Sequence, residues 1–205
     1  MKKVVFVIVS MLVLSSPTFA ANLFPLQTGN SWTYRDAASG DTFTIQVGTP
    51  VITDGRVYYS LRGYTPSRLF VRMDEETNRL MAWDELHEQE IPLVSFRPDG
   101  FWWQAPFRGC ESDGQTLPTP GEHNGPAGFF ETVLELRYGS VGCANGIEWE
   151  QFAQNYGLLR RIVASTLGPR QFDLISANIG GMTIGISAPF HLPMSGSVTR
   201  TTASR

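Results

Sequence analysis

Few side chains in this sequence combine the type and the spacing that chemistry needs. The three histidines, His87, His123 and His191, fall in a charged turn, a proline-rich stretch and the tail. The segment His87-Glu88-Gln89-Glu90 begins like a helical zinc motif but lacks the second histidine. Neither a Gly-x-Ser-x-Gly elbow nor a glycine-rich phosphate loop before a helix occurs. We therefore expect no metal ligand, no cofactor and no catalytic residue.

Paired carboxylates are the remaining candidates for acid and base chemistry. Glu75 and Glu76 are adjacent in a turn, and Glu148 and Glu150 alternate along an expected strand. Such acids are usually part of a solvated surface. A secreted hydrolase stays open as an alternative. It would be favoured by a deep pocket that holds two carboxylates within about 10 Å of each other.

The first 20 residues are typical of a secretory signal peptide. Lys2 and Lys3 precede an apolar run from Val4 to Leu14, and small residues, Thr18 and Ala20, prepare a cleavage site. A membrane span needs about 20 apolar residues, so we expect no transmembrane segment in the mature chain. The sequence predicts an exported protein, periplasmic or extracellular.

The charge of the mature chain argues against nucleic acid as a partner. No lysine follows the predicted signal, which leaves 14 arginines against 19 acidic residues and a formal charge of −5. Nucleic acids and anionic membranes bind clustered positive charge, whereas these arginines are scattered singly. The absence of lysine also excludes Schiff-base chemistry.

Two cysteines, Cys110 and Cys143, remain after the predicted cleavage. An even pair in an oxidising compartment is most simply a disulfide. Closing a loop of this length would stabilise the fold by roughly 3 to 4 kcal/mol. Two cysteines are too few for a metal site, and the close spacing of a redox pair is absent.

Phe101, Trp102 and Trp103 form the densest aromatic cluster of the chain. Three successive aromatic side chains in an extended segment point to both faces. One interpretation is an exposed surface for an apolar ligand or an envelope protein. The other is a short edge strand whose aromatic side chains close the end of the core.

The elements that must position these residues are strands. From Gly128 to Tyr138 apolar and polar residues alternate with a period of two, with Val133 on the polar side. No window of 11 residues keeps a helical apolar pattern free of glycine and proline. The sequence predicts an all-β fold: an antiparallel meander that forms a curved sheet or partly open barrel, with little helix apart from the signal peptide.

We expect one β-domain over residues 21–178, followed by a C-terminal strand and flexible tail over residues 179–205. Residues 97–127 are rich in glycine and proline and are expected to be mostly loop. Further strands are expected near Trp32 and Tyr34, and over Thr42–Val47, Val57–Arg62, Arg68–Met73, Arg79–Trp83, Ile91–Phe96, Ile147–Gln154, Leu158–Ser165 and Phe172–Ser176.

Three stretches carry a family resemblance: Phe24-Pro25-Leu26 with Gly29 to Tyr34, Gly125 to Phe129, and Tyr156 to Arg161. They are similar to exported bacterial β-domains of unknown function that open with a Phe-Pro-Leu…Gly-x-x-Trp-x-Tyr signature. The resemblance implies a fold and no activity. In some members the domain precedes a β-sandwich of the intracellular proteinase inhibitor (BsuPI) type, and Met182 to Thr201 would be the truncated start of one.

These observations favour an exported non-catalytic β-domain with a binding or structural role in the cell envelope. The expected partner is an unknown apolar ligand or an envelope protein. The alternatives are the secreted hydrolase described above and a remnant of a proteinase-inhibitor-type protein.

Overall fold

The computed structural model describes residues 22–104, 112–140 and 146–185. The predicted signal peptide, both cysteines and residues 186–205 lie outside the described residues. All regular structure in the described ranges is strand, and every strand pair is antiparallel. The prediction of an all-β fold, a curved sheet or partly open barrel, is confirmed. None of the described residues belongs to a helix that could cross a membrane.

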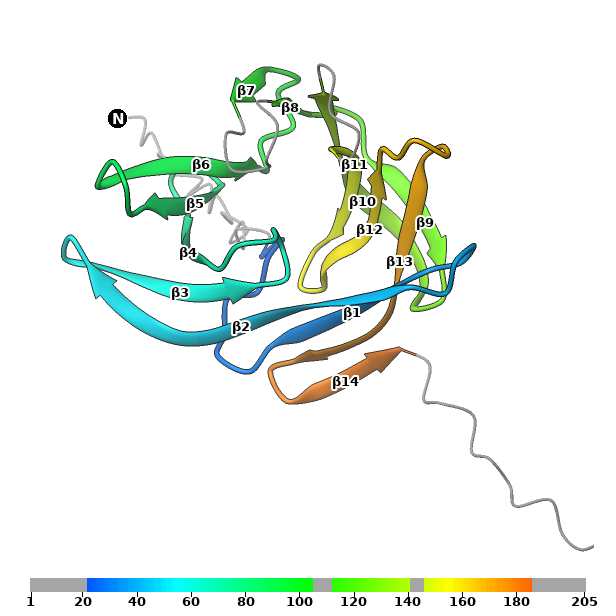
Figure 1. Ribbon diagram of the computed structural model, residues 1–205, viewed down its shortest axis with the longest axis horizontal. Coiled ribbons are helices and arrows are strands. Elements are labelled where there is room, and N and C mark those ends of the chain that lie inside the picture. The colour runs from blue at the N-terminus through cyan, green and yellow to red at the C-terminus, as the bar shows by residue number, and fades with distance from the viewer. Residues whose placement is uncertain (1–21, 105–111, 141–145, 186–205) are drawn as a thin grey trace, which may run out of the picture.

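In the described ranges, fourteen strands make one sheet, whose arrangement is drawn in Figure 1. In chain order they are β1 (Ser31–Asp36), β2 (Thr42–Thr53), β3 (Arg56–Arg62), β4 (Leu69–Asp74), β5 (Arg79–Asp84), β6 (Gln89–Ser95), β7 (Trp102–Gln104), β8 (Ser112–Thr116), β9 (Gly121–Gly125), β10 (Gly128–Ser140), β11 (Ile147–Ala153), β12 (Gly157–Val163), β13 (Arg170–Ile179) and β14 (Met182–Gly185). The hydrogen-bonded order is β6-β5-β4-β3-β2-β1-β13-β12-β11-β10-β8-β7, with β9 on β10 and β14 on β13.

Tight turns between neighbouring strands produce the predicted meander. Between β2 and β3, Thr53 pairs with Arg56, and the two loop residues Asp54 and Gly55 have φ of 49° and 71°. A two-residue hairpin with positive φ at both positions matches the twist of the flanking strands and favours Asp-Gly. The Asp54-Gly55 dipeptide therefore indicates that β2 and β3 are neighbours in the sheet.

The sheet curls because β1, near the start of the domain, pairs with β13, near its end. Figure 1 shows β4 to β6 along one side and β10 to β13 along the other, joined by β1 and β2. The open edges approach each other without a backbone ladder between β6 and β8. The Thr116 hydroxyl donates a buried hydrogen bond to the Ser95 carbonyl across this seam.

Neither open edge is a long, regular strand. β6 contains Pro92, which has no N–H to donate, and its pairing with β5 shifts register between Leu80 and Met81. Proline inside a sheet is confined to such edge strands and bulges. The opposite edge, β7, is three residues long.

The core is packed around the segment that enters β1. Phe24 is fully buried, with its ring centroid 5.3 Å from that of Trp32, 5.8 Å from Tyr64 and 6.3 Å from Phe152. The Trp32 Nε1–H donates to the Tyr156 carbonyl at 2.6 Å. Phe24, Trp32 and Leu158, from two of the stretches that carry the family resemblance, are therefore core residues. The third stretch, Gly125 to Phe129, forms the largely exposed turn between β9 and β10. Core and turn residues indicate a fold and no chemistry.

Two local predictions were wrong. Residues 97–127 were expected to be mostly loop, but they contain β8 and β9 in addition to β7, the short strand that was one interpretation of the aromatic cluster. Glycine is tolerated in β8 because Gly114 leaves room for the ring of Trp103, whose Cζ2 would lie 2.3 Å from a Cβ at that position. Val133, predicted on the polar side of β10, is fully buried, because the pairing of β10 with β9 shifts register between Phe130 and Val133.

Replacing Phe24 tests this core. Phe24→Ala empties a fully buried site and should lower the free energy of unfolding by about 3–5 kcal/mol. The matched control is Phe101→Ala, whose side chain is 76 % exposed and whose loss should change stability by less than about 0.5 kcal/mol. Urea unfolding of both variants gives the comparison, and equal values for the two would show that Phe24 does not anchor the core.

Candidate functional site

A pocket of about 920 Å³ lies where the β1–β2 turn, the segment after β3 and the β12–β13 connection come together. We call it the Arg161 pocket. Its apolar walls are Phe43, Ile147, Val163 and Phe172, and the Arg161 guanidinium lies at its buried side. Leu167, which is 99 % exposed, projects at its rim.

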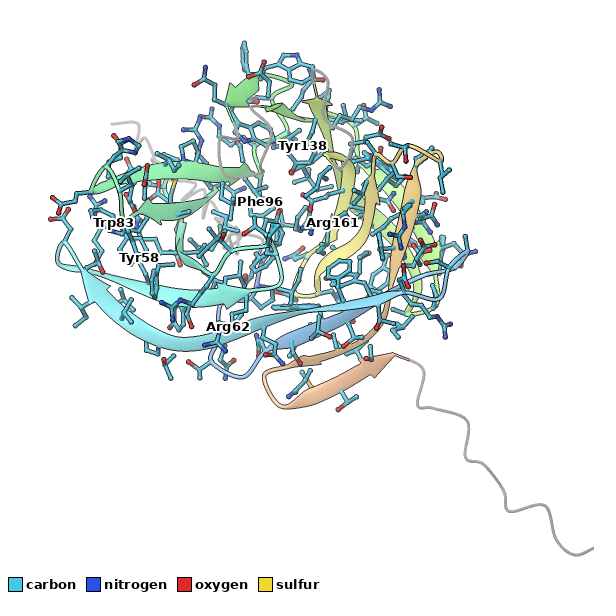
Figure 2. The ribbon with its side chains drawn as sticks, viewed as in Figure 1. Tyr58, Arg62, Trp83, Phe96, Tyr138 and Arg161 are labelled. Carbon is cyan, nitrogen blue, oxygen red and sulfur yellow. The ribbon has the colours of Figure 1, made fainter. Side chains whose placement is uncertain are left out.

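Strand register places Arg161 at this position. Arg161 of β12 lies opposite Glu150 of β11 on one side and Phe172 of β13 on the other. Residues directly opposite each other in an antiparallel sheet share a face. All three side chains are buried, so this row faces the interior, and Figure 2 shows Arg161 and Tyr138 on the concave side of the sheet.

The Arg161 guanidinium is held by three hydrogen bonds. Its Nε and Nη2 donate to Glu150 Oε1 at 2.9 and 2.8 Å, and its Nη1 donates to the Tyr64 carbonyl at 2.9 Å. Glu150 is fully buried and also accepts hydrogen bonds from the hydroxyls of Tyr64 and Tyr138 at 3.1 and 2.6 Å. The carboxylate and the guanidinium therefore compensate each other's burial.

Two aromatic rings contact the Arg161 guanidinium. Its Cζ lies 4.5 Å from the ring centroid of Tyr64 and 5.5 Å from that of Phe43. Cation–π contacts at these distances are strengthened by desolvation. Burial raises the pKa of nearby Tyr34 well above its usual value, and the charge of Arg161 opposes that effect without cancelling it. The Tyr34 hydroxyl stays neutral and donates to the Leu158 carbonyl at 2.8 Å.

The charged side chains at the rim of the pocket are also paired. Arg170 donates from Nε to Asp36 Oδ2 at 2.9 Å and from Nη2 to Asp41 Oδ2 at 2.7 Å. A hydrogen bond from the Ala38 N–H, followed by that from Arg170, lowers the pKa of Asp36 below its usual value. These contacts join the β1–β2 turn to β13 and leave the rim without a strong charge of one sign.

The carboxylates proposed from the sequence do not converge. Asp41 is the one carboxylate among the described residues that line the pocket, and it is bonded to Arg170. Glu150 is buried beneath the pocket, whereas Glu148 is exposed on the same strand. Glu75 and Glu76 are exposed in the β4–β5 turn. In the described ranges no three His, Cys, Asp or Glu side chains gather to hold a metal.

The aromatic cluster divides between two faces. Trp103 is 9 % exposed and packs edge-on against Tyr138, with ring centroids 6.1 Å apart. Phe101 and Trp102 are exposed, Trp102 by 55 %. None of the three lines the Arg161 pocket. A ligand or partner surface at Phe101 and Trp102 stays a prediction, as does the Cys110–Cys143 disulfide.

His123 is a second buried polar group, on β9. Its Nδ1 lies 2.9 Å from Gln151 Oε1, which assigns the proton to Nδ1. Its Nε2 is buried and has no hydrogen-bond partner among the residues that the structure describes. Burial lowers the pKa of His123, the Gln151 hydrogen bond raises it, and the Arg160 charge lowers it further. Within the described part of the chain, no hydrogen bond joins this imidazole to a residue that lines the Arg161 pocket.

The sequence did not predict the roles of Glu150 and Arg161. Glu150 was expected on a solvated surface, and Arg161 was expected only as part of a motif of core residues. One signal was available. Residues two apart on a strand point to the same face. Glu150 is two residues from the buried Phe152, and Arg161 is two residues from the buried Leu159. An acid and an arginine on the apolar faces of two successive strands indicate a buried ion pair.

Comparisons with known proteins give no established activity. No family model and no curated protein sequence matches the chain. A solved structure from Bacteroides fragilis NCTC 9343, described as a "putative exported protein with YmcC-like fold", is similar with a TM-score of 0.39 and 13 % sequence identity. The alignment covers 74 % of this chain and 96 % of that chain.

Removing Arg161 should destabilise the fold strongly. Arg161→Met takes the guanidinium from a fully buried carboxylate, and breaking such a pair costs about 3–5 kcal/mol. In the control, Arg56→Met removes a half-exposed partner of Glu90, which keeps Arg72, so about 0–1 kcal/mol should be lost. Both values come from urea unfolding at pH 7, and similar losses would contradict the structural role of the Arg161–Glu150 pair.

His123 should make stability depend on pH. The unfolded chain takes up a proton near the ordinary histidine pKa of about 6.5, whereas the folded chain takes it up only at lower pH. The free energy of unfolding should therefore fall as the pH falls from 7 to 5. In His123→Asn, which can still donate to Gln151, that slope should be shallower. Urea unfolding at pH 7, 6 and 5 measures it, and an unchanged slope would refute the assignment.

Proposed function

We propose that this protein is an exported, non-catalytic domain that binds an apolar ligand in the Arg161 pocket. The observation that carries the proposal is the pocket itself, a concave site with aromatic and aliphatic walls around a few fixed polar groups. Small-molecule sites in proteins typically have this lining, and volumes of roughly 300–1,000 Å³. A pocket of about 920 Å³ accommodates a ligand of several rings or a medium-length acyl chain.

Export is supported by the sequence of the first 20 residues. Their basic start, apolar run and small residues before position 21 are what a secretory signal requires. In an oxidising compartment the proposed Cys110–Cys143 disulfide would stabilise the domain. The proposed place of action is therefore the periplasm or the cell exterior.

A binding role is favoured over hydrolysis by the state of the pocket's charged groups. The one lining carboxylate, Asp41, and its neighbour Asp36 are bonded to Arg170. Retaining and inverting glycosidases need two carboxyl groups that face the same substrate from about 5–10 Å apart. The described pocket offers apolar contact and hydrogen-bond donors in place of such an acid pair.

The exposed pair Phe101 and Trp102 supports a second candidate, a contact with another envelope protein. These two rings lie side by side in sequence at the open edge of the sheet, next to β8. The described part of the C-terminal segment gives less support to an inhibitor remnant, because β14 is hydrogen-bonded to β13 and extends the same sheet. The pocket remains the stronger candidate because it is concave and large enough to enclose a small ligand.

A neutral fluorescent probe, N-phenyl-1-naphthylamine, tests the proposal. Val163→Trp places an indole on a half-buried pocket wall and should weaken probe binding at least ten-fold. The control Ile52→Trp makes the same change on a side chain that is 79 % exposed and should bind as the natural protein does.

A third variant separates the two candidate surfaces. Phe101→Ala combined with Trp102→Ala should leave the Kd of the probe unchanged, because neither ring lines the pocket. Loss of binding in this double variant with retention in Val163→Trp would move the site to the aromatic surface. No saturable binding by the natural protein would overturn the proposed function.

A further inference from the structure

We infer that the ligand of the Arg161 pocket carries an oxygen acceptor, a carboxylate or a neutral carbonyl, on a flat apolar body, and that Arg161 binds this oxygen. The inference rests on the proposed function and adds the chemical class of the ligand. It assigns Arg161 as the residue that selects the head group.

The first step is the number of donors on Arg161. A guanidinium has five N–H groups and no acceptor. Three hydrogen bonds, to Glu150 and to the Tyr64 carbonyl, use one N–H each from Nε, Nη1 and Nη2. One N–H on Nη1 and one on Nη2 have no acceptor among the described residues. Arg161 is 5 % exposed and lines the pocket, so the pocket is the source of a partner for them.

The second step is that these donors are held in place before a ligand arrives. Glu150 and the Tyr64 carbonyl fix the edge of the guanidinium, and the rings of Tyr64 and Phe43 lie against it. A donor fixed in advance loses little conformational entropy on binding. Hydrogen bonds from an ionised donor are shorter and about twice as strong as neutral ones.

The third step is the shape of the site beside these donors. The ring of Phe43 stacks on Tyr34 with centroids 4.7 Å apart and meets Phe172 edge-on at 5.2 Å. Ile147 and Val163 supply the aliphatic contacts of the same pocket. Aromatic side chains in these orientations pack well against a planar ligand. A flat apolar body with one acceptor at its end matches this combination.

Selectivity follows from the cost of leaving the donors unpaired. A ligand without an acceptor would cover the two N–H groups and remove the water that otherwise hydrogen-bonds to them. Sites built to hydrogen-bond a ligand group reject analogues that lack the group much more strongly than they distinguish an extra methylene. The acceptor should therefore raise affinity although it makes the ligand less apolar.

Three naphthalene compounds of similar size test this inference with the intact mature protein. They are 2-acetylnaphthalene, which carries a neutral carbonyl, 2-naphthoate, which carries a carboxylate, and 2-ethylnaphthalene, which carries no acceptor. Their Kd values are measured by displacement of N-phenyl-1-naphthylamine. We expect at least one oxygen-bearing compound to bind ten-fold or more tightly than 2-ethylnaphthalene, and the stronger of the two identifies the head group.

Arg161→Lys provides the conservative variant, because an ammonium keeps the charge beside Glu150 but lacks the planar fork. Its affinity for the preferred oxygen-bearing compound should fall at least five-fold, with 2-ethylnaphthalene unchanged. If the variant fails to fold, ¹⁵N-arginine NMR of the natural protein replaces it. The buried Arg161 N–H signals should shift with the oxygen-bearing compound and stay in place with 2-ethylnaphthalene.

The outcomes separate this inference from the proposed function. Equal affinities for all three compounds, each abolished by Val163→Trp, would keep the pocket as the ligand site and overturn the role of Arg161. An advantage for oxygen that survives intact in a folded Arg161→Lys variant, with no shift of the Arg161 signals, would also overturn it. Absence of binding by every compound and by the probe would overturn both proposals.

Discussion

The buried pair of Arg161 and Glu150 is the constraint on which much of this structure depends. Two opposite charges on facing strands are tolerated in the interior only when they meet and their remaining hydrogen-bonding groups are satisfied. A one-residue slip between β11 and β12 would turn one of them to the outer face and leave the other buried alone. The pair therefore specifies the register of these strands, and with it the row from Glu150 through Arg161 to Phe172 that forms one side of the pocket.

The same pair links distant parts of the chain. Arg161 donates to the carbonyl of Tyr64, which follows β3, while the Tyr64 ring packs on Phe24 at the entry to β1. Tyr138, from β10, completes the hydrogen bonds of Glu150. The core and the pocket consequently share their polar and aromatic residues. The packed core beside the pocket holds the N–H groups of Arg161 in a fixed direction. The interactions that stabilise the Arg161–Glu150 pair would therefore also determine any selectivity of the pocket.

Much of the fold could be predicted because its signals are local. Asp54-Gly55 marks a two-residue turn, and the alternation around Trp32 and Tyr34 marks a strand with a buried face. Strands β8 and β9 were missed because glycine and proline usually end strands, and Gly114 is accommodated in β8 through its contact with Trp103. Val133 was assigned to the wrong face of β10. The sequence alternates with a period of two across this strand, but a register shift between Phe130 and Val133 changes which side chains face the core. Most of the candidate site was missed, because Arg161 and Glu150 meet only through strand pairing.

β6 and β7, the two end strands of the hydrogen-bonded path, bear on how this chain behaves among copies of itself. β6 with its Pro92 and its register shift, and β7 with three residues, offer a second molecule few consecutive backbone groups to pair with. Exposed edge strands with unpaired backbone N–H and C=O groups can pair with other chains and lead to aggregation. These two strands are thus poor templates for pairing with a second copy, whereas a long uninterrupted edge strand would favour fibrils.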